Sequence, residues 1–222
     1  MSDWSDVRSF TVDTTAPSIP VLVSPSDAYI TNDDTPGFEW DDVVGAYLYQ
    51  IQIDNDADFS SPVIDVNDLT SSAYTVITAL GEDDYYWQVR VRDAAGNWSD
   101  YCTARSFSVD TTPPSIPANL EATAEPEGES ITISYDEVTD AVLYKISWSR
   151  MGASGIIETT KLSYTHTGLI NGVEYSYQVK AKDASGNWSD YSDAVEATPQ
   201  DTTPPSIPAN LEATAEPEGE SI

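Results

Sequence analysis

The stretch LINGVEYSYQVKAKDASGNWSDYS, at residues 169–192, joins an alternating strand pattern to a polar turn. From Tyr175 to Lys182 every second residue is aromatic or apolar, and Ser, Gln and Lys lie between them. A period of two residues predicts a β-strand with one buried and one solvated face. The Asp, Gly and Asn residues that follow predict a tight turn. A close counterpart, YYWQVRVRDAAGNWSDYC, lies at 85–102, so the strand and its turn are repeated.

A longer repeat sets the domain organisation. The string DTTPPSIPANLEATAEPEGESI fills residues 110–131 and again residues 201–222, and a looser copy, WSDVRSFTVDTTAPSIP, lies at 4–20. A fixed period about the length of one small β-sandwich predicts a tandem array. We expect the C-terminal strand of a preceding repeat at 1–13 and whole domains at 14–109 and 110–199. Residues 200–222 are expected to form a linker and the first strand of a following repeat.

Other alternating runs supply the remaining strands of both domains, and helix-period patterns are absent. The runs are GFEW (37–40), AYLYQIQI (46–53), SAYTVI (72–77), DYYWQVRVR (84–92), ITISY (131–135), AVLYKISW (141–148), LSYTH (162–166) and EYSYQVKAK (174–182). They predict an all-β fold of tandem antiparallel seven-stranded sandwiches. The predicted inner faces carry Phe38, Trp40, Tyr49, Ile51, Ile53, Tyr85, Trp87, Val89, Val91, Ile133, Tyr135, Tyr144, Ile146, Trp148, Tyr175, Tyr177, Val179 and Ala181.

The charge balance is strongly acidic, with 38 Asp and Glu against 9 Lys and Arg and a net charge of −29. Such a surface repels nucleic-acid phosphate and anionic membranes, so neither is an expected partner. No apolar run is long enough to span a membrane, and the start MSDWSD lacks the pattern of a secretion signal. The single cysteine, Cys102, excludes an internal disulfide framework.

The stretch at 169–192 resembles the E–F corner, F strand and F–G loop of a fibronectin type III domain. Leu169, Gly172 and Tyr175 match the Leu-x-x-Gly-x-x-Tyr signature of that family. The resemblance implies that Tyr175, and Tyr85 in the first domain, are structural tyrosine corners whose hydroxyls bond the backbone a few residues upstream. The repeated DTTPP linkers and the AGNWS-like loop are similar to those of the fibronectin-type repeats of large microbial surface or secreted proteins.

The sequence offers three kinds of candidate site. WSDYC at 98–102 and WSDYS at 188–192 resemble the WSxWS box of cytokine-receptor fibronectin domains, which implies a structural stack of Trp98 and Trp188 on the cations of the preceding strand. Asn97 and Asn187 fit the N-x-S pattern of glycosylation acceptors, and turn chemistry explains them equally well. Candidate ligands for weakly bound calcium, the one cofactor considered, are Asp54, Asp56, Asp58, Asp93, Asp110, Asp183 and Asp201.

No catalytic motif or cofactor-binding motif occurs, so we expect a segment that is not an enzyme. The main interpretation is a structural repeat of a long extracellular or cell-surface protein: a stalk, a spacer, an adhesin or a surface-fibre module. The alternatives are an accessory carbohydrate-binding array of a secreted polysaccharide-degrading enzyme and a self-assembling fibre subunit. The expected partners are neighbouring repeats and, in a fibre or surface layer, other copies. Proline clusters at the domain joints predict semi-rigid linkers.

Overall fold

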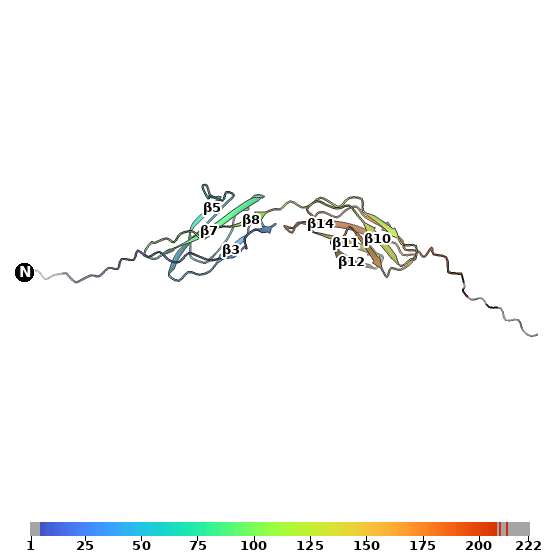
Figure 1. The fold of residues 1–222 in the computed structure, drawn as a ribbon, viewed down its shortest axis with the longest axis horizontal. Coiled ribbons are helices and arrows are strands. Elements are labelled where there is room, and N and C mark those ends of the chain that lie inside the picture. The colour runs from blue at the N-terminus through green and yellow to red at the C-terminus, as the bar shows by residue number, and fades with distance from the viewer. Residues whose placement is uncertain (1–4, 208, 210–211, 213–222) are drawn as a thin grey trace, which may run out of the picture. The chain divides into compact units, whose positions relative to one another are not determined.

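The computed structural model describes residues 5–207, 209 and 212. The chain divides into two compact units, and strands make up all the regular structure in the described part. One unit comprises the residues up to Ser115 with Val138–Leu143 and Ala181–Asp190; the other comprises Ile116–Glu137, Tyr144–Lys180 and the residues from Tyr191 onward. The strands form two β-sandwiches, β1–β8 and β9–β15 (Figure 1). Within the described residues no helix has the length and apolar character needed to cross a bilayer.

The first sandwich packs a sheet of three strands, in the order β1-β3-β6, against a sheet of five, in the order β2-β8-β7-β4-β5. Its strands lie between residues 22 and 109, inside the expected first domain. They are β1 (Leu22–Ser24), β2 (Tyr29–Thr31), β3 (Gly37–Trp40), β4 (Ala46–Asp54), β5 (Ile64–Leu69), β6 (Ala73–Thr75), β7 (Asp83–Asp93) and β8 (Arg105–Val109).

The expectation of seven antiparallel strands is wrong in detail for this sandwich, because its first strand changes sheets at Pro25. Before the proline, β1 pairs antiparallel with β3; after it, β2 pairs parallel with β8. Proline lacks the N–H that a continuing ladder needs. Arg105 secures the crossing: its guanidinium donates to the carbonyls of Leu22 (2.7 Å), Val23 (3.0 Å) and Pro25 (2.8 Å). The chain thus forms two short strands in different sheets, β1 and β2, and the described sandwich has eight strands.

The second sandwich has the seven strands expected, in sheets ordered β13-β10-β9 and β12-β11-β14-β15. The pairs β9–β10, β10–β13, β11–β12 and β14–β15 are antiparallel. The strands are β9 (Glu121–Ala124), β10 (Ser130–Ser134), β11 (Leu143–Arg150), β12 (Ala153–Thr159), β13 (Ser163–Thr167), β14 (Tyr175–Lys182) and β15 (Val195–Ala197). The all-β fold with two sandwiches is confirmed.

The predicted inner faces form the two cores. In the first sandwich the ring of Phe38 packs edge-on against Trp87 at 4.9 Å and Phe107 at 5.3 Å between centroids. In the second sandwich Tyr177 on β14 takes the place of Trp87, and both Tyr177 and its neighbour in the core, Ile146 on β11, are fully buried. Burying a large apolar side chain contributes about 1.5–3 kcal/mol, so these rows supply most of the stability of each sandwich.

Trp148 is the exception among the predicted inner residues, since it is only half-buried. Its ring crosses Gly155 on β12, where an added Cβ would lie 2.6 Å from the indole nitrogen. The ring then contacts His166 at 4.9 Å between centroids, and Nδ1 of His166 lies 3.1 Å from the Tyr177 hydroxyl. Burial lowers the pKa of His166 below 6.5, so the imidazole is neutral at pH 7.

The two tyrosine corners use opposite hydrogen-bond directions. The hydroxyl of Tyr85 donates to the carbonyl of Gly81 at 3.1 Å. The hydroxyl of Tyr175 accepts from the backbone N–H of Ile170 at 3.1 Å. Both bonds run to the backbone a few residues upstream, and both tyrosines are buried. The sequence shows the tyrosine but not the local turn that decides which backbone group faces it.

Residues 5–13, expected to belong to the last strand of a preceding repeat, form no strand. Their sequence RSFTVD differs by one letter from RSFSVD at 105–110, most of which forms β8. Phe10 is 88% exposed and Val12 is 70% exposed, whereas their counterparts Phe107 and Val109 are buried. Most of the strand expected near the other end, at 208, 210–211 and 213–222, lies outside the described residues.

Replacing Tyr175 with phenylalanine should destabilise the second sandwich. The substitution removes the acceptor for the Ile170 N–H, a part-buried hydrogen bond whose net contribution is about 0.5–1.5 kcal/mol. Urea denaturation of the full chain, followed by fluorescence and circular dichroism, measures the loss. Tyr164→Phe is the matched control, because Tyr164 lies at the surface of β13. Equal stability of the two variants would mean that water replaces the corner bond.

Candidate functional site

The loop after β14 is closed around one aspartate. Oδ1 of Asp183 accepts hydrogen bonds from the backbone N–H groups of Gly186 and Asn187, both at 2.8 Å. Its Oδ2 accepts from the Asn187 side-chain amide at 3.0 Å. Gly186 adopts a φ of 108°, a left-handed conformation that favours glycine. The loop therefore aims the amide of Asn187 in one fixed direction.

That amide holds the linker that precedes the second sandwich. Nδ2 of Asn187 donates to the carbonyl of Asp110 at 2.8 Å and, more weakly, to that of Thr112 at 3.4 Å. The hydroxyl of Ser185 donates to the carboxylate of Asp110 at 2.7 Å. We call the aspartate and asparagine of this loop, Asp183 and Asn187, the linker clamp.

The first sandwich has the same linker clamp, formed by Asp93 and Asn97. Asp93 accepts from the backbone N–H of Asn97 at 2.8 Å and from its side-chain amide at 2.9 Å. The amide also donates to the carbonyls of Asp13 at 3.1 Å and Thr15 at 3.4 Å. The hydrogen bond from the Asn97 side chain is the main reason that the pKa of Asp93 is lowered. Each sandwich thus binds the Asp-Thr-Thr segment in front of it.

Each linker is further fixed by a turn of its own, and two of the linkers are also held by the sandwich that comes before them. Each linker aspartate accepts from the N–H two residues later in an Asx turn, as Asp110 does from Thr112 at 3.1 Å. The same turn occurs at 13–15 and 201–203. Glu82 accepts from the Thr112 hydroxyl at 2.6 Å and from the Thr111 hydroxyl at 2.8 Å, and these hydrogen bonds lower the pKa of Glu82. It also accepts from the N–H of Thr111 at 3.0 Å. The carbonyl of Pro126 plays the same part toward Thr202 and Thr203.

Two small side chains in each loop replace a strand partner. In the second sandwich the hydroxyl of Ser189 accepts from the N–H of Ala181 at 2.9 Å, and that of Ser192 accepts from Val179 at 3.1 Å. In the first sandwich Ser99 and the Cys102 thiol take these places against β7. Burial raises the pKa of the Cys102 thiol, which suits an unreactive structural role.

The box tryptophans stack on cations of the neighbouring strand. The Arg90 guanidinium lies 4.5 Å from the centroid of Trp98 and 4.7 Å from that of Tyr101, and Arg92 lies 5.5 Å from Trp98. In the second sandwich Lys182 lies 5.8 Å from Trp188, and Lys180 lies 4.9 Å from Tyr191. Each contact contributes about 0.5–1 kcal/mol at such partly exposed sites. We call these stacked aromatic rings and cations the ladder. It is the kind of stack that the resemblance to the WSxWS box implies.

The ladder also bears on sugar binding, because a carbohydrate stacks on the free face of an aromatic ring. The Trp98 ring contacts two guanidinium groups, and cations also lie over Trp188, Tyr101 and Tyr191. The most exposed described tyrosines lie on separate elements: Tyr29 on β2, Tyr47 on β4, Tyr164 on β13 and Tyr191 in the loop before β15. The described surface therefore has no row of adjacent open rings.

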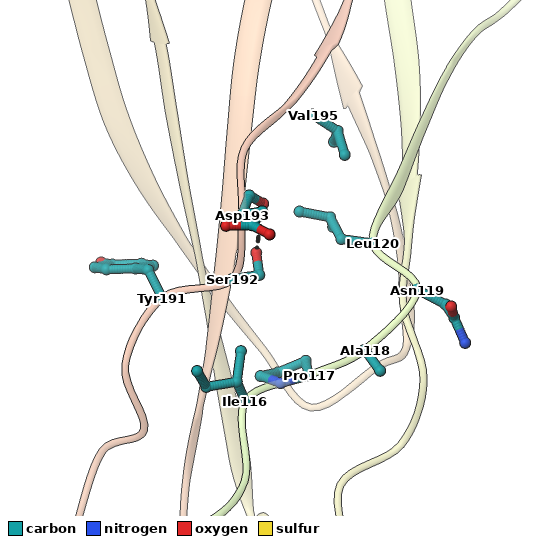
Figure 2. Close-up of a pocket in the computed structure, with 9 residues that line it drawn as sticks. All are labelled: Ile116, Pro117, Ala118, Asn119, Leu120, Tyr191, Ser192, Asp193 and Val195. Atoms are coloured by element: carbon teal, nitrogen blue, oxygen red, sulfur yellow. Dashed lines mark hydrogen bonds between the residues drawn. The ribbon is translucent and has the colours of Figure 1, made fainter.

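A groove of 490 Å³ opens between residues 116–120 and 191–195 at one edge of the second sandwich (Figure 2). Figure 2 shows Ile116, Pro117, Leu120 and Val195 around the hollow, with the Tyr191 ring directed away from it. A groove of 520 Å³ lies at the same edge of the first sandwich, where Arg105 takes the place of Val195. Ser192 and Asp193 border the first groove, and Asp27, Cys102 and Arg105 border the second. Asp27 accepts from the N–H of Ser106, and the Cys102 sulfur accepts from the N–H of Val89.

The calcium candidates are not brought together. Within the described part of the chain no three acidic, histidine or cysteine side chains are grouped to hold a metal. The carboxylates of Asp93, Asp110 and Asp183 are occupied by hydrogen bonds, and Asp201 accepts from Thr203. Of the remaining loop, Asp56 and Asp58 are exposed and Asp54 is 2% exposed. Asp54 has a buried oxygen without a hydrogen-bond partner, so it is the calcium candidate that the structure favours most.

The two N-x-S asparagines face inward to their linkers. Asn187 is 8% exposed, and its amide nitrogen already has three acceptors: Asp183, Asp110 and Thr112. A glycan on this nitrogen would remove a donor and displace the linker. The geometry thus gives Asn97 and Asn187 a role as linker ligands, and turn chemistry accounts for their place in the repeated loop.

Comparison with known proteins agrees with this fold. Residues 23–111 match the bacterial Ig-like domain family. The three fibronectin domains FN1–FN3 of chicken CNTN1, in their crystal structure, share the fold with a TM-score of 0.57 and 11% identity, over 85% of this chain and 69% of that one. The chain is a tandem of fibronectin type III-like β-sandwich domains.

These fibronectin type III-like domains are homologous to segments of bacterial glycoside hydrolases. Exoglucanase B of Cellulomonas fimi is 31% identical over 236 residues, which cover 94% of this chain and 19% of that enzyme. Chitinase A1 of Niallia circulans is 33% identical over 208 residues, which cover 89% of this chain and 28% of that enzyme. An alpha-amylase of Niallia circulans matches 40% of the chain at 41% identity. The chain thus spans less than a third of these relatives.

Several residues that matter in these fibronectin type III-like domains were missed from the sequence. Glu82, Ser185 and the Pro126 carbonyl hold linkers, and Arg105 secures the sheet crossing. The repeated Asp-Thr-Thr letters are a signal that the linker is specifically recognised. The residues that recognise it come from loops 29–84 positions away, and no local pattern marks them.

Removing the second linker clamp should expose its linker to proteolysis. Asn187→Ala deletes the amide that binds the carbonyls of Asp110 and Thr112. Losing about 1.4 kcal/mol of this local stability would raise the open fraction, and the cleavage rate by proteinase K at 109–113, about tenfold. Mass spectrometry of timed digests locates the cuts. Asn97→Ala is the matched control and should expose 13–15 instead. An unchanged rate at 109–113 would contradict the linker clamp.

Calcium should have a small effect on these fibronectin type III-like domains. A single weak site stabilises the fold by only about 0.4 kcal/mol when the calcium concentration equals Kd, a shift of about 2–3 °C in Tm. Calorimetric melting with millimolar calcium or with EDTA measures the effect, and Asp54→Asn tests the one favoured ligand. A larger rise that survives Asp54→Asn would place the site elsewhere.

Proposed function

We propose that this chain is a non-catalytic accessory segment of a secreted polysaccharide-degrading enzyme, in which it serves as a spacer with held linkers. The observation that carries the proposal is the extent of the match to two such enzymes. Exoglucanase B and chitinase A1 cover 94% and 89% of the chain, while the chain covers only 19% and 28% of them. Relatives that share this segment therefore have most of their length left for other domains.

The linker clamps support the spacer role. A flexible Gly/Ser linker would let neighbouring domains wander, whereas here proline and side-chain contacts fix the path of each linker. Asn97 and Asn187 hold the segment before each sandwich, and Glu82 and Pro126 hold the segment after it. Because both sandwiches use side-chain hydrogen bonds to hold their linkers, the structure favours a mechanical role over a ligand site on the sheets.

The proposal replaces the stalk of a surface protein as the first choice, because the matched relatives are hydrolases and not adhesins. It keeps the expected extracellular location, since insoluble polysaccharide is degraded outside the cell. The acidic surface suits a solvated spacer that does not adsorb to anionic polymers. Neighbouring repeats and domains of the same protein are the proposed partners.

Direct sugar binding is the second candidate, and the arrangement of the rings disfavours it. Cations lie on the box tryptophans, and the exposed tyrosines lie on separate elements. We expect the chain to stay in solution when mixed with insoluble cellulose or chitin, as serum albumin does. Saturable pull-down that Tyr47→Ala abolishes would instead support a binding surface beside the ladder.

The spacer role is tested in an exoglucanase or chitinase that carries a homologous segment. Replacing that segment with this chain should preserve the rate on soluble oligosaccharides and on insoluble polysaccharide. Replacing it with a Gly/Ser linker of equal length should lower only the rate on insoluble substrate. The same replacement with a variant carrying Asn97→Ala and Asn187→Ala isolates the linker clamps. Equal rates for all three versions on both substrates would rule out the spacer role.

A further inference from the structure

The edge strand β12 has one side free. Within the described residues it ends the sheet β12-β11-β14-β15 and pairs only with β11. The pairing runs without a bulge from Tyr144–Thr159 to Arg150–Ala153. A long, regular edge presents a row of unpaired backbone N–H and C=O groups, which can add a strand from another chain.

The corresponding edge of the first sandwich is protected from such pairing by an irregular register and a charged residue, which we call the edge guard. Strand β5 has an interrupted register against β4, and Asp65 projects beside the edge, where it accepts from the side-chain amides of Gln50 and Gln52. Charged residues and bulges on an edge are the usual means of preventing association. The first sandwich uses both.

The second sandwich has no charged residue at the position of Asp65. The segments AYLYQIQID (46–54) and AVLYKISWS (141–149) align without a gap, so Gln52 and Ser147 are equivalent. Gln52 faces Asp65 across the first pair of strands, and Ser147 faces Ile156 across the second. Ile156 therefore takes the place of Asp65, and it is 62% exposed. The stretch from Ala153 to Ile157 contains neither charge nor proline.

The charge distribution points to a second copy as the partner. Residues 141–164 contain three bases, Lys145, Arg150 and Lys161, against one acid, Glu158, in a chain of net charge −29. The equivalent residues 46–74 contain five acids and no base. Two copies that meet through their β11–β12 hairpins therefore meet with less like-charge repulsion than contact through the five acids of residues 46–74 would produce.

We propose that β12 is a self-association edge, at which two copies of the chain pair β12 against β12, antiparallel, about a twofold axis. Such a contact is isologous, so each Ile156 is covered by the other copy and the two sheets join into one. The pairing goes beyond the proposed spacer function and does not depend on it, since it concerns a different face of the second sandwich from the linker clamp.

Analytical ultracentrifugation of the full chain over a range of concentrations tests the proposal. The weight-average mass should rise from 24.1 kDa toward twice that value as concentration increases. The dimer should strengthen with salt, because salt screens the repulsion between two bodies of like net charge. Ile156→Asp, which copies the charge of the edge guard, should weaken the dimer at least tenfold. Ile77→Asp, at another exposed isoleucine, should leave it unchanged.

Each other outcome overturns the proposal. A monomer at all concentrations and salt levels would show that the edge stays unpaired. A dimer that survives Ile156→Asp would place the contact elsewhere. Binding that weakens with salt and needs an added acidic protein or anionic polymer would identify the positive hairpin as a docking site for a foreign partner. Circular dichroism of both variants confirms that they fold before their masses are compared.

Discussion

The period of two residues along β7 and β14 is the constraint on which both sandwiches depend. One face of each strand places Trp87 or Tyr177 in the middle of a core, so the strand cannot slip by one residue without exposing its apolar row. The other face is thereby fixed as well, and it presents Arg90 and Arg92, or Lys180 and Lys182, at the spacing that the following loop requires. The alternation along β7 and β14 therefore determines both the buried core and the position of the cations in the ladder.

The loops after these strands convert that register into linker contacts. The serines, and Cys102 in one case, bond to the strand backbone and bring the box tryptophan over the cations. The loop start then places an aspartate where its carboxylate can orient an asparagine amide. This chain of dependence explains why the acidic groups there are saturated by protein donors. A strongly acidic chain can still use its carboxylates as hydrogen-bond acceptors within the fold.

The strands and cores were predictable because they depend on local alternation. Nearly all of the predicted inner residues are buried, and Trp148 differs only because Gly155 on a neighbouring strand lets its ring slide outward. What the sequence did not reveal depends on partners far along the chain. The sheet change at Pro25 is held by Arg105, and the hydroxyl of Tyr175 accepts rather than donates because of the local turn at Ile170. The asparagines were noticed as turn or glycosylation residues, and their true neighbours, the linkers, lay 75–84 residues away.

The position of each linker clamp has a consequence for how such a chain can grow by duplication. The linker clamp and the Asp-Thr-Thr segment that it holds are two partners, and they lie at opposite ends of the same repeat: the segment near its beginning and the clamp near its end. A duplicated stretch of gene that starts at the linker codon for Asp110 carries both partners in one piece. A unit cut at any other point of the repeat has both partners only when the neighbouring copy supplies the missing one. The identical strings at 110–131 and 201–222 both begin at that aspartate, so the repeated text opens with the segment that the linker clamp holds.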